Sequence, residues 1–396
     1  MRDRSLLVSS VGVSALGDML LGIPLALHVH ALSGSALAVS AFFVALWGPS
    51  IVLGGVAGRA VDRWENTRLL AVVSVAQAVA ACGLLAAGSL GAILALTALL
   101  GAGAAVGQTA EFALIPAVAG SDERVARTNG HVEAARYLGM TAGPALGGVL
   151  SAAGLLDVAI AVDAASFAFV AAAALGLRAR RAPAAGAHEH ARGGIAVLLA
   201  DRTLAVTLAA AVGALLFFTI SATAEVFFAT DVLGAGGTGF GLMLTCWTLG
   251  MVAGAIGLAR RVPRAWLATG ALVALTVQGL GIAGVAAAGA LGVALGGMAV
   301  GGVGHGVKNV LLRTLIHQRV PDAARGRAYA AYNAARNAAE LGALTAGGVL
   351  VGLLGARAAL AIAGLVPLFI GLLALFIAGR REASGTTTRR TAYVNG

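Results

Sequence analysis

The sequence predicts an all-α membrane protein in which twelve transmembrane helices form two pseudo-symmetric six-helix bundles. Three observations support this fold class. Of the residues, 59% are hydrophobic and only 11% are charged, whereas soluble domains carry about 25% charged residues. Many apolar runs reach the length of roughly 20 residues that a spanning helix needs. Finally, the second half of the chain repeats the first.

The repeat is clearest around residues 129–150. The Ala-Ala-Arg of 134–136 recurs at 334–336, and the Gly-Gly-Val-Leu of 147–150 recurs at 347–350, an offset of 200 positions. The same offset pairs Trp47 with Trp247, so the duplication extends well beyond this segment. A period of half a chain is too long for a solenoid, and it predicts two copies of one large unit.

Each copy contains six apolar segments that are long enough to cross a bilayer. They cover about residues 6–28, 38–58, 68–88, 92–116, 128–152, 157–177, 203–229, 238–258, 266–287, 291–316, 327–352 and 358–379. These runs are much longer than the roughly ten alternating residues of a barrel strand, so helices are predicted. The expected domains are an N-terminal bundle of residues 1–180, a cytoplasmic linker of 181–201, a C-terminal bundle of 202–380 and a disordered cytoplasmic tail of 381–396.

The placement of arginine predicts the orientation in the membrane. Of 26 arginines, 22 lie in the N-terminus, in every second loop or in the tail. Because Lys and Arg in short loops stay in the cytoplasm, both termini are expected there, in a multi-pass protein of the inner or plasma membrane. The net charge of +10 reflects this bias and favours attraction to anionic lipid headgroups. The lipid bilayer is therefore an expected partner, and nucleic acid is not.

The first predicted span carries an acid, Asp18, directly after Gly17 and near the middle of the helix. An acid at this depth costs roughly 2.5–3.5 kcal/mol on insertion scales and is by default a functional hypothesis. No basic residue lies within one turn to neutralise it, so we predict that Asp18 carries a coupling proton. The alternative is a structural aspartate held by hydrogen bonds.

The short loop after the second span contains a recognisable charge pattern. Gly58, Asp62, Arg63 and Arg68 resemble the signature of the loop between spans two and three in the major facilitator superfamily, although residues 64–67 replace the usual Gly-Arg. Gly58 is expected to allow a tight exit from the helix. The resemblance implies that Asp62 contacts the start of span eleven as part of a gate. The alternative is a simple topogenic charge cluster.

The fifth span contains the strongest functional pattern. Gly139, Gly143 and Gly147 repeat every four residues, which lets helices approach closely, and Pro144 removes a backbone donor and bends the helix. Together with Gly148, these residues resemble the span-five signature of exporters in the same superfamily, which implies a gating role. The alternative is ordinary helix packing through small residues.

A further resemblance narrows the family. The Gly-Asp of span one, the connector 116–129 and the Asp-Ala-Ala-Ser-Phe that begins at Asp163 in span six are similar to the branch that exports siderophores and macrolides. Span six is peripheral in that family. The resemblance therefore implies that Asp163 ties helices together rather than contacting substrate.

Four further sets of residues complete the candidate site. Gln108 and Lys308 occupy matching positions in the two copies and are expected to bind polar substrate groups. Glu111 is expected to be either a proton site or a structural partner of Lys308. Glu225 in span seven lies among phenylalanines, which desolvate a carboxylate and attract organic cations, so it is a second proton-coupling candidate; the alternative is a rim glutamate in water. Candidates for substrate stacking are Trp47, Phe217, Phe218, Trp247 and Tyr332.

Several function classes have no support in the sequence. The only lysine, Lys308, follows Val307 and precedes Asn309, so the chain contains no P-loop. No HExxH or GxSxG motif occurs, and both cysteines lie within predicted spans. An enzyme, a metal site and a cofactor are therefore not expected.

Together these features predict a secondary active transporter with the major facilitator fold. We expect a proton-coupled exporter of small amphipathic compounds, such as drugs, antibiotics or siderophore-like metabolites, that works as a monomer by alternating access around a cavity at the midplane. Its partners would be a small-molecule substrate and protons. The alternatives are a proton-linked or passive uptake porter and, in another class, a non-transporting membrane sensor.

Overall fold

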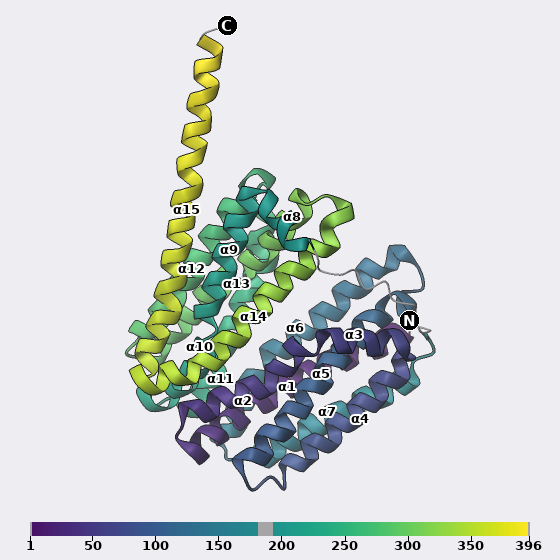
Figure 1. Cartoon of the computed structure of the whole chain (residues 1–396). Coiled ribbons are helices and arrows are strands. Elements are labelled where there is room, and N and C mark those ends of the chain that lie inside the picture. The colour runs from purple at the N-terminus through teal and green to yellow at the C-terminus, as the bar shows by residue number, and fades with distance from the viewer. Residues whose placement is uncertain (1, 181–192, 395–396) are drawn as a thin grey trace. The chain divides into compact units, whose positions relative to one another are not determined.

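The computed structural model describes residues 2–180 and 193–394, which are helical with short connections and contain no strand (Figure 1). This confirms the predicted all-α class. The chain divides into two compact units. The first unit comprises Met1–His188, Ala222–Thr248 and Leu344–Ala356, and the second unit comprises Glu189–Ser221, Leu249–Ala343 and Arg357–Gly396.

The predicted spans correspond to helices or to helices broken by a short turn. In the first copy these are α1 (Arg2–Ser33), α2 (Ala36–Val52) with α3 (Gly54–Arg63), α4 (Asn66–Leu84), α5 (Leu90–Ala119), α6 (Asp122–Ala152) and α7 (Leu156–Gly176). In the second copy they are α9 (Arg202–Phe218) with α10 (Ser221–Phe227) and η1 (Phe228–Val232), α11 (Gly236–Ala253) with η2 (Gly254–Leu258) and η3 (Ala259–Arg261), η4 (Arg264–Trp266) with α12 (Leu267–Ala287), α13 (Leu291–Arg319), α14 (Asp322–Leu354) and α15 (Ala356–Val394).

Hydropathy alone selects most of these helices as membrane spans. Within the described ranges, nine helices are long and apolar enough to cross a bilayer, or ten if the bent pair α2 and α3 forms one span. The other two predicted spans are α6 and α13, which have 31 and 29 residues and carry charged side chains such as Arg136 and Lys308. Their length suffices for a crossing, and with them the helices match the twelve that the sequence predicts.

The structure describes parts of the expected linker and tail. Residues 181–192 of the predicted linker lie outside the described residues, and the rest of that linker contains the short helix α8 (Gly194–Ala200). Residues 381–394 of the predicted tail form the last part of α15, which continues as a helix to Val394.

The second span bends earlier than the sequence indicated. α2 ends at Val52, and α3 begins at Gly54 after a 51° change of direction. Pro49 lies within the last turn of α2, and a proline followed by a glycine is a common cause of such a kink. The expectation that Gly58 forms a tight helix exit is therefore wrong. Gly58 lies inside α3, and a Cβ atom there would meet nothing within 4 Å.

In the first unit, α1 and α6 pack along each other with their backbones in close contact. A Cβ atom at Gly139 would lie 2.6 Å from the carbonyl oxygen of Gly12, and one at Gly143 would lie 2.9 Å from that of Leu16. Gly147 faces Leu20 in the same way. These three glycines form one stripe because residues four apart share a helix face. The stripe is thus what lets the two helices approach.

Two other helix contacts in the first unit also depend on glycines, which have no side chain. On α1, a Cβ atom at Gly17 would lie 2.7 Å from a carboxylate oxygen of Asp163 on α7. On α6, Gly148 faces Gly237 and Gly241 at the start of α11. Small residues therefore bring α7 against α1, and α11 against α6.

The residues that depart from the family signature form a helix cap. The Glu65 carboxylate precedes α4 and accepts hydrogen bonds from the backbone N–H groups of Thr67 and Arg68, both at 3.0 Å. Arg180 lies 3.4 Å from the same carboxylate. Partial burial alone would raise the pKa of Glu65, but the Thr67 and Arg68 hydrogen bonds and the Arg180 charge outweigh it and hold the pKa below its ordinary value. Such a cap satisfies donors that the first turn leaves free.

In the second unit, Asp201 caps α9 in a similar way. One carboxylate oxygen accepts a hydrogen bond from the N–H of Leu204 at 3.0 Å, and the other accepts one from Arg319 at 2.9 Å. Partial burial opposes ionisation, but these hydrogen bonds and the Arg319 charge prevail and lower the pKa of Asp201. The cap thereby joins the start of α9 to the end of α13.

The glycine stripe makes a testable prediction. Gly143→Ala should lower the free energy of unfolding by about 1–3 kcal/mol, because the added methyl group overpacks the contact with α1. Gly130→Ala is the matched control on the same helix, since a Cβ atom there meets nothing within 4 Å. Thermal unfolding of the purified variants in detergent measures the difference, and equal melting temperatures would contradict the packing argument.

The Asp201 cap predicts a dependence on pH. Asp201→Ala should cost about 0.5–2 kcal/mol at pH 7 because the cap is lost, whereas Asp201→Asn should cost less because its amide oxygen still accepts a hydrogen bond. A group whose folded pKa is lowered stabilises the fold above its ordinary pKa. The stabilisation relative to Asp201→Asn should therefore vanish as the pH falls below 3.8 and through the lower folded value. A difference that persists in acid would refute this assignment.

Candidate functional site

Acidic side chains from three helices gather in the interior of the first unit. They are Asp18 of α1, Glu111 of α5 and Asp163 of α7. Asp163 and Glu111 are 1% and 5% exposed, whereas Asp18 is partly exposed. Asp18 interacts electrostatically with both other acids and with Arg136. An acid cluster at this depth in a membrane span is the usual mark of a functional site.

Asp18 differs from its neighbours in having no fixed partner. Glu111 is paired with Arg136, and the Asp163 carboxylate accepts a 3.5 Å hydrogen bond from the Ser166 hydroxyl. Asp18 accepts no hydrogen bond from the residues that the structure describes. Its carboxylate is therefore available to a proton or to a ligand.

Asp18 lines two adjoining cavities of the first unit. The first has a volume of about 110 Å³ and contains Gln108 and Asp163 among its polar lining residues. The second has a volume of about 130 Å³ and is lined by Glu225 and Pro144, with an otherwise largely apolar wall that includes Phe240. Trp47 lines both cavities and stacks on Phe43, with ring centroids 5.0 Å apart.

The second cavity brings together four groups that the sequence singled out. Asp18, Glu225, Trp47 and Pro144 come from α1, α10, α2 and α6, and all line it. Glu225 is 4% exposed, so it is a buried residue and the alternative of a rim glutamate in water is wrong. The aromatic residues that line this cavity with it are Phe43, Trp47 and Phe240 rather than its neighbours in sequence.

Glu111 belongs to a buried ion pair. Its carboxylate lies 3.1 Å from Arg136 of α6, which also lies 3.8 Å from Glu133 and 5.2 Å from the centre of the Phe112 ring. Lys308, the partner that the sequence offered as an alternative, donates a 2.8 Å hydrogen bond to Gln278 within the second unit. Glu111 therefore anchors α5 to α6 and interacts electrostatically with Asp18.

The remaining substrate candidates have varied surroundings. In the second unit, Lys308 is buried, Phe218 lies 5.8 Å from the ring of His305, and Tyr332 lines a polar cavity between α13 and α14. Phe217 is partly buried near the end of α9, and Trp247 lies near the end of the first unit's part of α11. Neither of these two residues lines the cavities at Asp18.

The candidate gating residues of the loop lie at the surface of the first unit. Asp62 is partly exposed at the end of α3, and Arg63 and Arg68 are exposed. On α6, Gly139, Gly143, Gly147 and Gly148 all make the close contacts described above. Their packing role is clear, and a role in gating stays a prediction.

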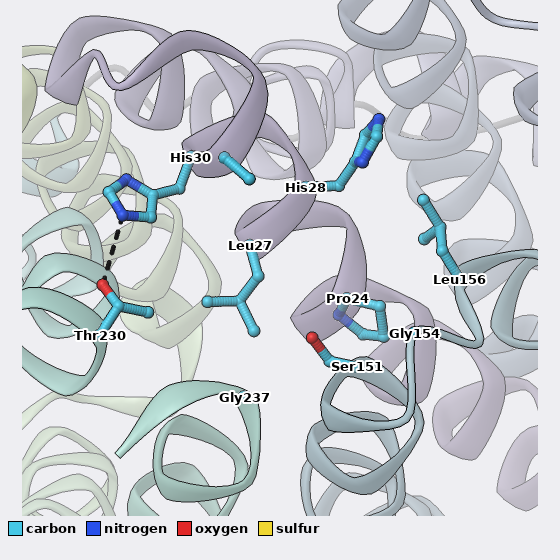
Figure 2. A pocket seen from close by; sticks show the side chains of 10 residues that line it. Pro24, Leu27, His28, His30, Ser151, Gly154, Leu156, Thr230 and Gly237 are labelled. Carbon is cyan, nitrogen blue, oxygen red and sulfur yellow. Dashed lines mark hydrogen bonds between the residues drawn. The ribbon is translucent and has the colours of Figure 1, made fainter. Parts of the chain in front are cut away.

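A third cavity of the first unit contains two histidines (Figure 2). It has a volume of about 370 Å³ and is lined by His28, His30 and Thr230 among others. His30 lies 3.0 Å from a carboxylate oxygen of Asp231 and 3.3 Å from the Thr230 hydroxyl. His28 points to a different side of α1 in Figure 2, and the described residues contain no cluster of three metal-ligating side chains.

Sequence reasoning missed two features of this site. Asp163 lines the first cavity, although the family resemblance assigned it only a tie between helices. The signal for this position in the sequence is Gly17, which leaves room on α1 for the Asp163 side chain. Phe240 of the second cavity carried no signal, because one phenylalanine among glycines in α11 matches no pattern.

The comparisons with known proteins agree with this architecture. The profile of the Major Facilitator Superfamily matches residues 7–343. A search of curated protein sequences finds no match. Among solved structures, a POT family transporter in complex with 5-aminolevulinic acid has a TM-score of 0.76 at 11% identity, covering 95% of this chain and 96% of that one.

Two further structures show the same likeness. The nucleoside transporter NupG has a TM-score of 0.73 at 14% identity, over 94% of this chain and 99% of that one. A bacterial homolog of the human lysosomal transporter Spinster, in an inward-facing and unoccupied conformation, has a TM-score of 0.70 at 15% identity, over 96% and 97%. Identities this low show a shared fold.

The ion pair between Glu111 and Arg136 makes a testable prediction, and the second copy of the repeat provides a matched control. Arg136→Gln should lower the free energy of unfolding by about 3–5 kcal/mol, because it leaves the buried Glu111 carboxylate without its partner. The repeat-equivalent change, Arg336→Gln, should cost at most about 1 kcal/mol, since Arg336 is 43% exposed and lies 3.6 Å from Glu340.

Denaturant unfolding of the purified variants in detergent tests this difference. The double change Arg136→Gln with Glu111→Gln should recover part of the loss, because it also removes the stranded charge. Equal losses for Arg136→Gln and Arg336→Gln would show that the Glu111 pair is not a buried anchor.

Proposed function

Because the chain belongs to the major facilitator superfamily, which indicates a transporter rather than an enzyme, we propose that it is a proton-coupled exporter of small amphipathic compounds. The observation that carries this proposal is that Asp18 and Glu225 line one cavity whose wall is otherwise largely apolar. Apolar walls suit the body of an amphipathic compound, and acids suit a proton or a cationic group.

Proton coupling follows from the repulsion between neighbouring carboxylates. Asp18, Glu111 and Asp163 lie in one low-dielectric region with a single nearby arginine, and like charges there repel strongly. A proton on Asp18 removes part of this repulsion. A cationic substrate group beside the carboxylate would do the same, so proton and substrate would compete for one charge site, as antiport requires.

The cavity volume bears on how a substrate would enter. Drug-sized pockets occupy roughly 300–1,000 Å³, whereas the cavity at Glu225 has about 130 Å³. A compound of that size therefore needs a conformation in which the lining helices have separated. Pro144 lines this cavity on α6, and a helix that lacks one backbone hydrogen bond bends more readily.

The wider organisation of the transporter is part of the same proposal. The halves 1–180 and 202–380 would move against each other, with both termini in the cytoplasm of a cell whose inner or plasma membrane holds the protein as a monomer. Asp62, Arg63 and Arg68, on the loop that resembles the family signature, would control this movement. The span-five glycines with Pro144 support export over uptake. Drugs, antibiotics and siderophore-like metabolites are the compounds that this branch resemblance suggests.

The acids make the decisive prediction. Asp18→Asn and Glu225→Gln should each reduce proton-dependent export of amphipathic dyes by about tenfold or more, which corresponds to about 1.4 kcal/mol, while the protein still reaches the membrane. Asp157→Asn is the matched control, because it makes the same change at an exposed acid at the start of α7. Efflux from drug-sensitive cells, with and without a proton uncoupler, measures the effect.

The other outcomes of this experiment are equally informative. Cells that accumulate the dye when they express the protein would show an uptake porter. Full export in both acid variants would leave an uncoupled porter as the better explanation, and a dye content that the protein does not change would favour a non-transporting membrane sensor. Export that the uncoupler leaves unchanged would disprove proton coupling.

A further inference from the structure

The second unit contains a polar cavity that the transport proposal leaves without a role. It has a volume of about 270 Å³, and its lining residues are Asn309, Arg313, Tyr329, Tyr332, Asn333 and Arg336. The set contains two guanidinium groups, two amides and two phenols, and it contains no acid. All six residues lie on α13 and α14, which are two of the predicted spans, and the side chains of Arg313 and Asn333 are exposed.

The spacing of these residues explains how they meet. Asn309 and Arg313 are four residues apart on α13, and the other four occupy positions i, i+3, i+4 and i+7 of α14, so each group shares one helix face. The Tyr329 hydroxyl donates to the Arg313 carbonyl oxygen at 2.7 Å and joins the two helices. Behind them lies a cluster of buried apolar side chains that includes Leu311 and Ala331.

Most of the polar groups in this cavity have no protein partner. Within the described residues, Arg313 forms no ion pair, and the side chains of Asn309, Asn333 and Tyr332 make no hydrogen bond. Arg336 has one acid nearby, Glu340, at 3.6 Å. Arginine and amide donors that converge on a cavity and have few bonds within the protein are available to an acceptor from outside.

The repeat shows that the counter-charges were present in the first copy. Arg136 is neutralised there by Glu111 and Glu133. Two hundred positions later, Arg336 keeps the arginine, but the matching positions are Leu311 and Asn333. The second copy thus has the arginine but neither of the two glutamates that pair with it in the first copy.

Additional positive charge makes the imbalance larger. Arg336 interacts electrostatically with the buried ammonium group of Lys308 and with His305, and Arg313 has no counterpart in the first copy, where Ala113 stands at the matching position. Within the described residues, the two guanidinium charges of Arg313 and Arg336 therefore face one acid, Glu340, with the Lys308 amine close by. Repulsion among them is relieved when an anion enters.

The positive-inside rule does not explain Arg336. That rule concerns loops and the ends of spans, whereas Arg336 follows the start of α14 at Asp322 by 14 residues, or about 21 Å along the helix at 1.5 Å per residue. Its position is deep within the helix. A role in orientation is better served by loop arginines such as Arg260 and Arg261.

We propose that the cavity between α13 and α14 is a binding site for an oxyanion, a carboxylate or a phosphate monoester, carried by a compound with an aromatic or apolar body. The Arg313 and Arg336 guanidinium groups provide the paired donors that such anions prefer. Asn309 and Asn333 add amide donors. Tyr329 and Tyr332 provide ring surface beside the charged group.

Arginine footprinting tests this site directly on the complete, unmodified protein. Phenylglyoxal labels accessible arginines, and mass spectrometry measures the rate at each one. Phenyl phosphate should slow the labelling of Arg313 and Arg336 by about tenfold at about ten times its dissociation constant, because only the unoccupied fraction reacts. Labelling of Arg260 and Arg261 should not change, and benzylammonium, a cation of similar size, should protect neither pair.

The lipid composition of the nanodiscs distinguishes a free compound from a lipid as the source of the oxyanion. In nanodiscs of phosphatidylcholine, protection by phenyl phosphate shows a site for a free compound. Protection in nanodiscs that contain phosphatidic acid, a lipid phosphate monoester, without any added compound shows a site for a lipid phosphate. Absence of protection in both arms would overturn the proposal.

A variant adds a second measurement. Arg313→Gln should abolish the protection of Arg336 by phenyl phosphate, since a single guanidinium group remains, whereas Arg260→Gln should leave this protection intact. Thermal unfolding shows that each variant is folded before labelling. Undiminished protection of Arg336 in Arg313→Gln would contradict a shared site.

Discussion

The close approach of α1 to its neighbours is the constraint on which the candidate site depends. Gly139, Gly143 and Gly147 let the backbone of α6 touch one side of α1, and Gly17 lets α7 touch another. Asp18 follows Gly17 directly and is therefore held beside Asp163 while its carboxylate opens into a cavity. Without side chains to flex at these contacts, α1 has little freedom to turn Asp18 away. Packing through absent side chains thus positions the one acid of the cluster that has no fixed partner.

Charge inside the membrane is the second organising feature, and the two copies treat it differently. In the first, Arg136 is surrounded by carboxylates, one of which is paired at 3.1 Å. In the second, Arg336 retains only Glu340, and Lys308 and Arg313 add positive charge. The two copies differ at matching positions such as Glu111 and Leu311, and these differences give each half its own chemistry. The conserved offset makes these substitutions visible without any other sequence.

The sequence sufficed for the helices and their order, because each span carries its own apolar run and because the repeat duplicates every one. It also selected Asp18 and Glu225, since an acid in an apolar run is conspicuous. It could not show which side chains meet. The bend after Val52 places Gly58 inside a helix, and Glu65, which caps α4, also contacts Arg180, 115 positions away. Phe240 and Asp163 join the cavities only through packing between helices, a property of three-dimensional arrangement that periodicity within one helix does not contain.

Both proposals for function have the same physical basis, which is charge that faces a cavity without a partner among the described residues. A structural charge in a membrane span is paired, as Glu111 is with Arg136, because an unpaired one costs several kcal/mol. Asp18 and Arg313 depart from this pattern while facing cavities. A membrane protein tolerates an unpaired charge where a proton, an ion or a ligand can neutralise it, and the sign of the charge then selects that species. A lone carboxylate selects a proton or a cation, and a pair of guanidinium groups selects an oxyanion. The chemistry of each cavity is therefore determined by which counter-charge its helices omit.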